Sequence, residues 1–143
     1  MVNDGDKNKS KVQFDETYQK IHDDAMFLIK VNFGASKEKA EENKGYLGLA
    51  AKTIIKDILD IGTYIRIANS IFPTSQLEAK ERRTYQQKAI GLCFDILTKY
   101  KNIMKMFEVR DDKYVEEIKH LVHEINCLKR WKKSDDKRFA DLP

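Results

Sequence analysis

The chain has 143 residues, 41% of them hydrophobic and 35% charged, and its 27 basic and 23 acidic residues give a formal net charge of +4. This length suits one domain with its own core, and this composition excludes a disordered chain. No apolar stretch reaches the roughly 20 residues that span a bilayer, and the polar start at Met1–Asp6 does not resemble a secretory signal, so we expect a cytoplasmic protein without membrane contact.

The apolar pattern divides the chain into three parts. Residues 1–11 are polar and offer nothing to bury, which predicts a disordered N-terminal arm. Residues 12–133 repeat apolar side chains at steps of three and four, the spacing of one helical face, and show no alternation typical of strands. Residues 134–143 are expected to form a flexible, basic C-terminal tail.

The first predicted helix begins near Val12 and ends at Gly34, which can take the left-handed conformation that closes a helix. The second begins after the N-cap Ser36 and ends before Pro73, because the residue preceding a proline is pushed out of the helical region. Its apolar face is the longest in the chain and holds Leu47, Ala51, Ile54, Ile58, Ile61, Ile65, Ala68 and Phe72.

The third predicted helix begins at Ser75, in a capping motif in which Glu78 reaches back to the backbone N–H of the serine. It ends near Val109, and an aspartate in the following turn is expected to cap the fourth helix, which fades between Trp131 and Ser134. Four amphipathic helices with short connections predict an all-α fold, an up-and-down antiparallel four-helix bundle. The wide apolar faces of the second and third helices allow a subunit interface in a ring-like homo-oligomer.

Motifs of the common enzyme classes are absent from the sequence. There is no glycine-rich phosphate loop, no H-E-x-x-H, no paired C-x-x-C and no serine or cysteine in a nucleophile context. The R-x4-H motif of HEPN ribonucleases is also absent, because Thr17, Val115 and Ile118 stand five residues before the three histidines. Cys93 and Cys127 fall on apolar faces and are expected to be buried thiols. We therefore expect no catalytic residues, no cofactor and no enzymatic activity.

One segment of the fourth helix leaves a metal-dependent bundle enzyme as an alternative. Glu117 and His120 have the i, i+3 spacing of carboxylate-bridged metal sites in bundles. Such sites need a second pair on another helix, and His22 has no carboxylate three residues before it. We therefore expect no metal and interpret His120 and His123 as solvated or interface residues.

The excess positive charge lies at the end of the fourth helix. Between Lys129 and Arg138 there are six basic and two acidic residues. Their local net charge of +4 equals the net charge of the whole chain. Basic side chains exchange condensed counterions for phosphates, and Trp131 could stack on a base or anchor the helix end. Cations at a helix C-terminus are also favoured by the helix dipole alone. The candidate nucleic-acid-binding residues are Lys129, Arg130, Trp131, Lys132, Lys133, Lys137 and Arg138.

Two arginines near the start of the third helix, Arg82 and Arg83, are secondary candidates for nucleic-acid binding. We expect antiparallel packing to place this start beside the end of the second helix and the start of the fourth, so it need not lie near residues 129–138. A single continuous basic patch within one subunit is therefore not assured, and a ring of subunits could join the two segments.

Arg66 and Asn69 interrupt the apolar pattern near the end of the second helix. A charged group beside a packed seam needs a partner, because leaving it unpaired costs several kcal/mol. We interpret both residues as part of an oligomer interface.

Three segments together resemble the accessory variability determinant (Avd) proteins of diversity-generating retroelements, within a wider four-helix family that includes ribosomal-RNA intervening-sequence proteins. They are Tyr64–Pro73 (YIRIANSIFP), Arg82-Arg83 with Lys88–Cys93 (KAIGLC), and Leu128–Asp135 (LKRWKKSD). The resemblance covers about residues 14–139 as an architecture. Avd proteins are typically more basic than this chain.

The resemblance implies a non-enzymatic accessory protein that forms a barrel-like homopentamer. Such a protein binds the reverse transcriptase of the element and its template RNA or cDNA, and supports mutagenic reverse transcription. The alternative is a helical protein-interaction scaffold that contacts its enzyme partner with little direct nucleic-acid binding.

Overall fold

The computed structural model describes residues 4–143, with side chains described from Glu16 onward. This part of the chain contains helices and no strand. The four long helices are α1 (Asp4–Lys30), α3 (Lys44–Ser70), α4 (Gln76–Phe107) and α5 (Val115–Arg138). The connections hold the short helix α2 (Lys37–Glu42) and two 3₁₀ turns, η1 (Asn32–Gly34) and η2 (Asp111–Lys113).

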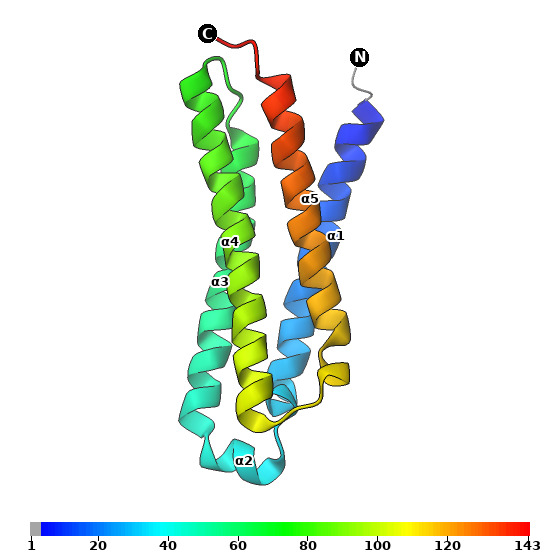
Figure 1. The fold of residues 1–143 in the computed structure, drawn as a ribbon, viewed down its shortest axis with the longest axis vertical. Coiled ribbons are helices and arrows are strands. Elements are labelled where there is room, and N and C mark those ends of the chain that lie inside the picture. Colours follow the sequence, from blue (N-terminus) through cyan, green and yellow to red (C-terminus); the bar gives the residue numbers. More distant parts are fainter. Residues whose placement is uncertain (1–3) are drawn as a thin grey trace.

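The four long helices pack against one another and alternate in direction (Figure 1). Helix α3 packs along α4, α5 packs along both α1 and α4, and α1 meets α3 more sparsely. The start of α1 and the C-terminus lie at one end of the molecule, and α2 closes the other (Figure 1). The predicted all-α class with antiparallel long helices is confirmed.

The core lies where the apolar faces of the four long helices meet. Its members recur at the three-and-four spacing that was read from the sequence, because that spacing keeps them on one side of each helix. Burying each large aliphatic side chain contributes about 1.5–3 kcal/mol. Fully or almost fully buried members include Ile21, Ala25, Leu28, Ile54, Ile58, Ile61, Ala89, Ile96, Leu121 and Leu128.

Helix α1 ends at Lys30, and the chain turns over three residues rather than at Gly34 alone. Asn32, Phe33 and Gly34 all have positive φ angles, of 53°, 58° and 83°. The buried ring of Phe33 holds this turn in the core, and the hydroxyl of Tyr114 donates a 2.6 Å hydrogen bond to the Phe33 carbonyl. Burial of a large ring and one long-range hydrogen bond compensate for the backbone strain.

The single second helix that was predicted is broken into α2 and α3 at Asn43. Ser36 caps α2 as predicted, since its hydroxyl accepts from the Lys39 backbone N–H at 3.2 Å. The Asn43 side chain donates to the Lys39 carbonyl at 2.8 Å, a local hydrogen bond that competes with continuation of the helix. Helix α3 then runs to Ser70, and ends before Pro73 as predicted.

The caps of α4 and α5 agree only in part with the predicted ones. Ser75 caps α4 by accepting from the Glu78 N–H at 3.3 Å, but the Glu78 carboxylate accepts from the Thr74 N–H instead of that of Ser75. The residue before α5 is Tyr114, without a side-chain cap, because Asp111 and Asp112 lie within η2. The prediction that an aspartate caps the fourth helix was wrong.

The boundaries at both ends of the bundle also differ from the predicted ones. Of the predicted arm at residues 1–11, residues 1–3 lie outside the described part, and α1 begins at Asp4 rather than near Val12. The predicted flexible tail at 134–143 continues α5 to Arg138 and then returns to α4. The Gln76 side chain donates to the Phe139 and Ala140 carbonyls at 2.8 and 3.2 Å, and these hydrogen bonds attach the tail to the helix start.

Candidate nucleic-acid interface

The predicted basic segment forms the last turns of α5, at the end of the bundle where α1 begins and the C-terminus lies (Figure 1). Lys129, Arg130, Lys133 and Lys137 are exposed and follow one another at helical spacing, so they share the outer side of α5. Lys119 lies further back on the same side. At 1.5 Å rise per residue, these five side chains, which we call the basic face, extend over about 27 Å.

The two acidic residues of the segment do not offset the basic face. Asp135 is buried and accepts from the guanidinium of Arg82 at 2.7 and 3.3 Å. Asp136 pairs with Arg83 at 2.8 Å. Glu124, the other carboxylate between residues 119 and 138, is fully buried. Both C-terminal aspartates are therefore used in contacts to α4, and the outer side of α5 keeps its positive charge.

Arg82 is not available for phosphate, contrary to the prediction. Only 4% of the residue is exposed, and besides Asp135 it donates to the Ala68 and Ile71 carbonyls at 3.3 and 3.0 Å. Gln86 also donates to Asp135 at 2.6 Å. Arg82 therefore joins the end of α3 to α4 and α5, and its role is structural.

The expectation that the start of the third helix lies beside the start of the fourth was wrong as well. In an antiparallel bundle α5 returns toward the end of the molecule where α4 begins, so the start of α4 lies beside the end of α5 (Figure 1). The pair Arg83–Asp136 crosses directly between the two helices. One subunit therefore brings both sequence segments together.

Trp131 anchors the helix end rather than projecting from it. The residue is half-buried, and the Arg82 guanidinium carbon lies 5.2 Å from its ring centroid. The same guanidinium lies 5.6 Å from the ring of Phe139, which Arg138 also approaches at 4.7 Å. Of the two roles that the sequence left open for Trp131, stacking on a base and anchoring, the contacts favour anchoring.

The seam between α4 and α5 contains an aromatic residue that the sequence did not single out. Phe94 is 47% exposed, and the ammonium of Lys129 lies 5.4 Å from its ring centroid. Nearer the end of the bundle, Lys132 donates to Gln87 at 2.9 Å. Phe94 does not belong to the apolar positions that recur along α4 at steps of three and four. That position in the pattern was the only feature of the sequence that could have predicted its exposure.

Arg66 and Asn69 are both exposed on α3 and do not interrupt the core. The Arg66 guanidinium donates to the Thr63 hydroxyl at 3.3 Å and lies close to Gly62. Their exposure leaves both side chains accessible to another subunit. Their assignment to an oligomer interface stays a prediction.

The histidine segment of α5 forms an interhelical contact. His120 Nδ1 lies 2.6 Å from Asp24 Oδ2 of α1, so His120 is paired within the protomer rather than solvated. Glu117 is buried beside it, and desolvation raises its pKa. Over the residues whose positions are described, no group of three or more His, Cys, Asp or Glu side chains could hold a metal ion.

The cysteines are buried free thiols, as predicted. Burial raises the pKa of the Cys93 thiol, which disfavours the nucleophilic thiolate. On the outer side of α5, His123 Nε2 and the Arg130 guanidinium lie 3.6 and 3.3 Å from the sulfur of Cys127. None of the described helices combines the length and the apolar content needed to cross a bilayer.

Two carboxylates on neighbouring helices have pKa values shifted in opposite directions. Desolvation raises the pKa of Asp57 on α3 to about 6, and hydrogen bonds from Asp57 and Lys99 lower that of Asp95 on α4. Lys99 lies 2.6 Å from Asp57 and 2.9 Å from Asp95. This three-residue network of ion pairs crosses between α3 and α4.

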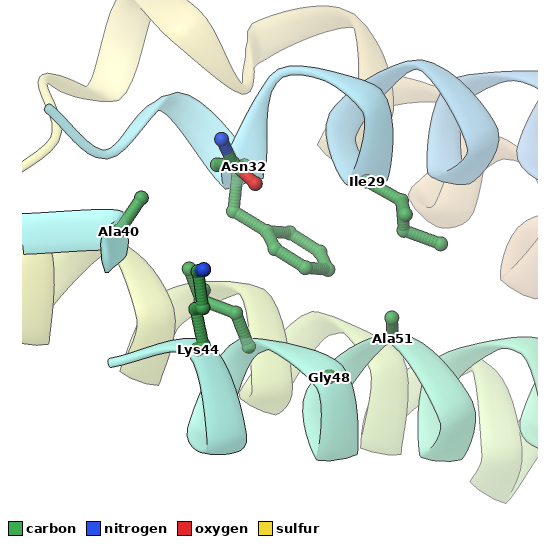
Figure 2. Close-up of a pocket in the computed structure, with 8 residues that line it drawn as sticks. Ile29, Asn32, Ala40, Lys44, Gly48 and Ala51 are labelled. Atoms are coloured by element: carbon green, nitrogen blue, oxygen red, sulfur yellow. The ribbon is translucent and has the colours of Figure 1, made fainter. Parts of the chain in front are cut away.

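A small pocket of about 240 Å³ lies at the opposite end of the molecule from the basic segment. Figure 2 shows Ile29 of α1 facing Gly48 and Ala51 of α3, with Ala40 and Lys44 at the other end of the pocket. Its lining contains one lysine but no carboxylate, histidine or cysteine. It therefore offers no acid–base or nucleophile pair.

Comparisons with family models, curated proteins and solved structures found no match to this chain. Its function therefore has to be inferred from the side chains described above. The feature with the clearest chemistry is the basic face of α5 together with the α4 seam beside it. A row of exposed cations whose neighbouring carboxylates are paired with arginines of another helix can bind a polyanion through phosphate contacts.

Proposed function

We propose that this protein is a non-enzymatic subunit that binds RNA or cDNA through the basic face of α5. The observation that carries the proposal is that Asp135 and Asp136 are paired with Arg82 and Arg83 of α4. Because both carboxylates are used in these pairs, Lys129, Arg130, Lys133 and Lys137 keep their positive charge on the outer side of α5, and Lys119, which has the exposed Glu116 one turn before it, extends the row. Such a row favours phosphate contacts, which give affinity without base sequence preference.

The resemblance to Avd proteins extends this proposal to a biological role. The protein would act in the cytoplasm as the accessory subunit of a diversity-generating retroelement, where it binds the reverse transcriptase and the template RNA or cDNA and supports mutagenic reverse transcription. It would assemble into a ring-like homo-oligomer, a pentamer, with Arg66 and Asn69 at subunit contacts. A ring would repeat the basic face around its circumference, and several modest sites on one nucleic acid would then add up to high avidity.

Charge reversal on the basic face tests the proposal. In the variant K129E/R130E/K133E/K137E we expect at least a tenfold loss of affinity for a labelled RNA in fluorescence anisotropy. The helical circular dichroism spectrum and the oligomer size should stay unchanged, because all four side chains are exposed. Four lost phosphate contacts on a single strand should also reduce the slope of log K against log salt by about 3.

The matched control carries the same change in net charge at exposed lysines elsewhere, in K30E/K52E/K101E/K105E. It should retain most of the affinity, because those lysines lie outside the basic face. An equal loss in both variants would indicate an effect of net charge alone. Unchanged RNA binding in the first variant would overturn the assignment of the basic face.

A protein-interaction scaffold is the second candidate, and one observation favours it. Phe72 and Leu77, which flank the turn between α3 and α4, are each 78% exposed. Such apolar side chains at one tip are typical of protein contacts. Co-purification with a reverse transcriptase that survives nuclease and high salt, and is lost in F72S/L77S, would support this function over nucleic-acid binding.

A further inference from the structure

The exposed ring of Phe94 lies directly beside the basic face. It projects from α4, and the ammonium of Lys129 lies 5.4 Å from the ring centroid. Almost half of the residue remains accessible to solvent, at 47%. An aromatic ring next to a row of unopposed cations combines the two contacts that single-stranded nucleic acids use, stacking for the base and charge for the phosphate.

The surface next to this ring is open. Gly91 precedes Phe94 by three residues, so it lies on the adjoining part of the α4 surface. Gly91 is exposed, and a Cβ placed on it would meet nothing within 4 Å. Further along the same seam, Gln87 contacts Lys132 and Arg83 contacts Asp136, so polar and charged side chains continue the surface toward the end of the bundle. Because Gly91 has no side chain, a planar group could approach the ring of Phe94 from the side of Gly91.

The ring of Trp131, also in this region, is occupied within the fold. The Arg82 guanidinium lies against the ring of Trp131, and Arg82 is itself held by the buried carboxylate of Asp135. Moving Trp131 toward a base would disturb these buried contacts, whereas the cation over the ring of Phe94 belongs to the exposed side chain of Lys129, which can move aside. Phe94 is therefore the ring of this surface that can accept a stacked base.

We propose that Phe94, with Lys129 beside it, is a stacking site for an unpaired base of single-stranded RNA or DNA. This inference rests on the proposed nucleic-acid-binding function and specifies its substrate class. A duplex keeps its bases stacked on one another, so it can use the basic face but not the ring. The protein should therefore bind an unpaired strand more tightly than a duplex of equal length.

The test compares affinities of the full-length protein for two labelled probes, a 20-nucleotide oligouridine and a 20-base-pair RNA duplex. In F94L, which keeps apolar bulk but loses the aromatic face, affinity for the single strand should fall about 5- to 100-fold, the range expected for one lost base–aromatic stack. Duplex affinity should stay within about twofold. F94W should retain single-strand binding. The control F27L replaces an exposed phenylalanine of α1, and should change neither affinity.

Tryptophan fluorescence provides a second readout. The wild-type chain has one tryptophan, Trp131, which Arg82 covers. Oligouridine should quench the added indole of F94W beyond any change seen in the wild-type protein. Unaltered single-strand affinity in F94L, or an equal loss for both probes, would overturn the stacking site while leaving the basic face intact. Failure of the wild-type protein to bind either probe would instead overturn the proposed function itself.

Discussion

The guanidinium of Arg82 and the carboxylate of Asp135 meet through two hydrogen bonds, of 2.7 and 3.3 Å, although 53 residues separate them in the chain. Their side chains are only 5% and 7% exposed. The same guanidinium holds the carbonyls of Ala68 and Ile71 at the end of α3. One buried ion pair thus joins three helices at the end of the bundle that carries the basic face.

Removing one member of this pair should be strongly destabilising. In R82A or D135A the remaining charge is buried without its partner, and we expect the free energy of unfolding to fall by about 3–5 kcal/mol. Urea denaturation followed by circular dichroism measures this loss. The control R83A breaks the neighbouring pair with Asp136, which is about half exposed and should cost less than about 1 kcal/mol. If R82A or D135A lost no more free energy of unfolding than R83A, the buried pair would not stabilise the bundle.

The hydroxyl of Tyr114 should stabilise the turn after α1. In Y114F the buried carbonyl of Phe33 loses its donor while the packing of the ring is kept, and we expect a loss of about 1–3 kcal/mol. Y46F is the matched control, because Tyr46 is 40% exposed and its ring packs near that of Phe107 at a centroid distance of 6.1 Å. Denaturation midpoints that coincide for the two variants would argue against a structural role for this hydrogen bond.

Asp57 should make stability depend on pH between about 4 and 6. Because its folded pKa, about 6, lies above the ordinary value of 3.8, the folded state binds more protons in this window. The stability that this group contributes is therefore present at low pH and lost as pH rises through 6. The side chain at position 57 cannot titrate in D57N. The free energy of unfolding of D57N, minus that of the wild type, should therefore rise by on the order of 1 kcal/mol from pH 4 to pH 7.

Urea denaturation of both proteins at pH 4, 5, 6 and 7 checks the titration of Asp57. The difference between the two proteins reports the titration of Asp57 together with that of Asp95, because a hydrogen bond from Asp57 lowers the pKa of Asp95. Lys99 keeps Asp95 as a partner in the variant, so the network is not left with an unpaired cation. A difference that is constant with pH would contradict the raised pKa.

Much of the fold was predictable from the sequence because local rules govern it. The three-and-four spacing placed Ile54, Ile58 and Ile61 on the face that is buried. Ser36 and Ser75 marked helix starts because a serine hydroxyl can accept from a backbone N–H three residues later in the chain. The break at Asn43 was missed, since a side-chain hydrogen bond there competes with a helix that the apolar pattern alone would continue.

The candidate site was predictable only in its charge. The sequence showed that cations accumulate between Lys129 and Arg138, and the structure keeps them on the outer side of α5. Which side chains are available there depends on contacts between helices. Arg82 was expected outside and is buried, whereas Phe94 was overlooked and is exposed beside Lys129.

The sequence by itself determined the helices, their inward faces and the position of the positive charge, because each depends on residues a few positions apart. The tertiary structure alone decided the pairings of Arg82 with Asp135 and of His120 with Asp24, which join residues 53 and 96 positions apart. Periodicity says which side of a helix turns inward, but not which residue of a neighbouring helix lies at the same height. That height is set by the packing of the whole bundle, which buries Asp135, pairs Asp136 with Arg83 at the surface and leaves the exposed lysines of the basic face outside.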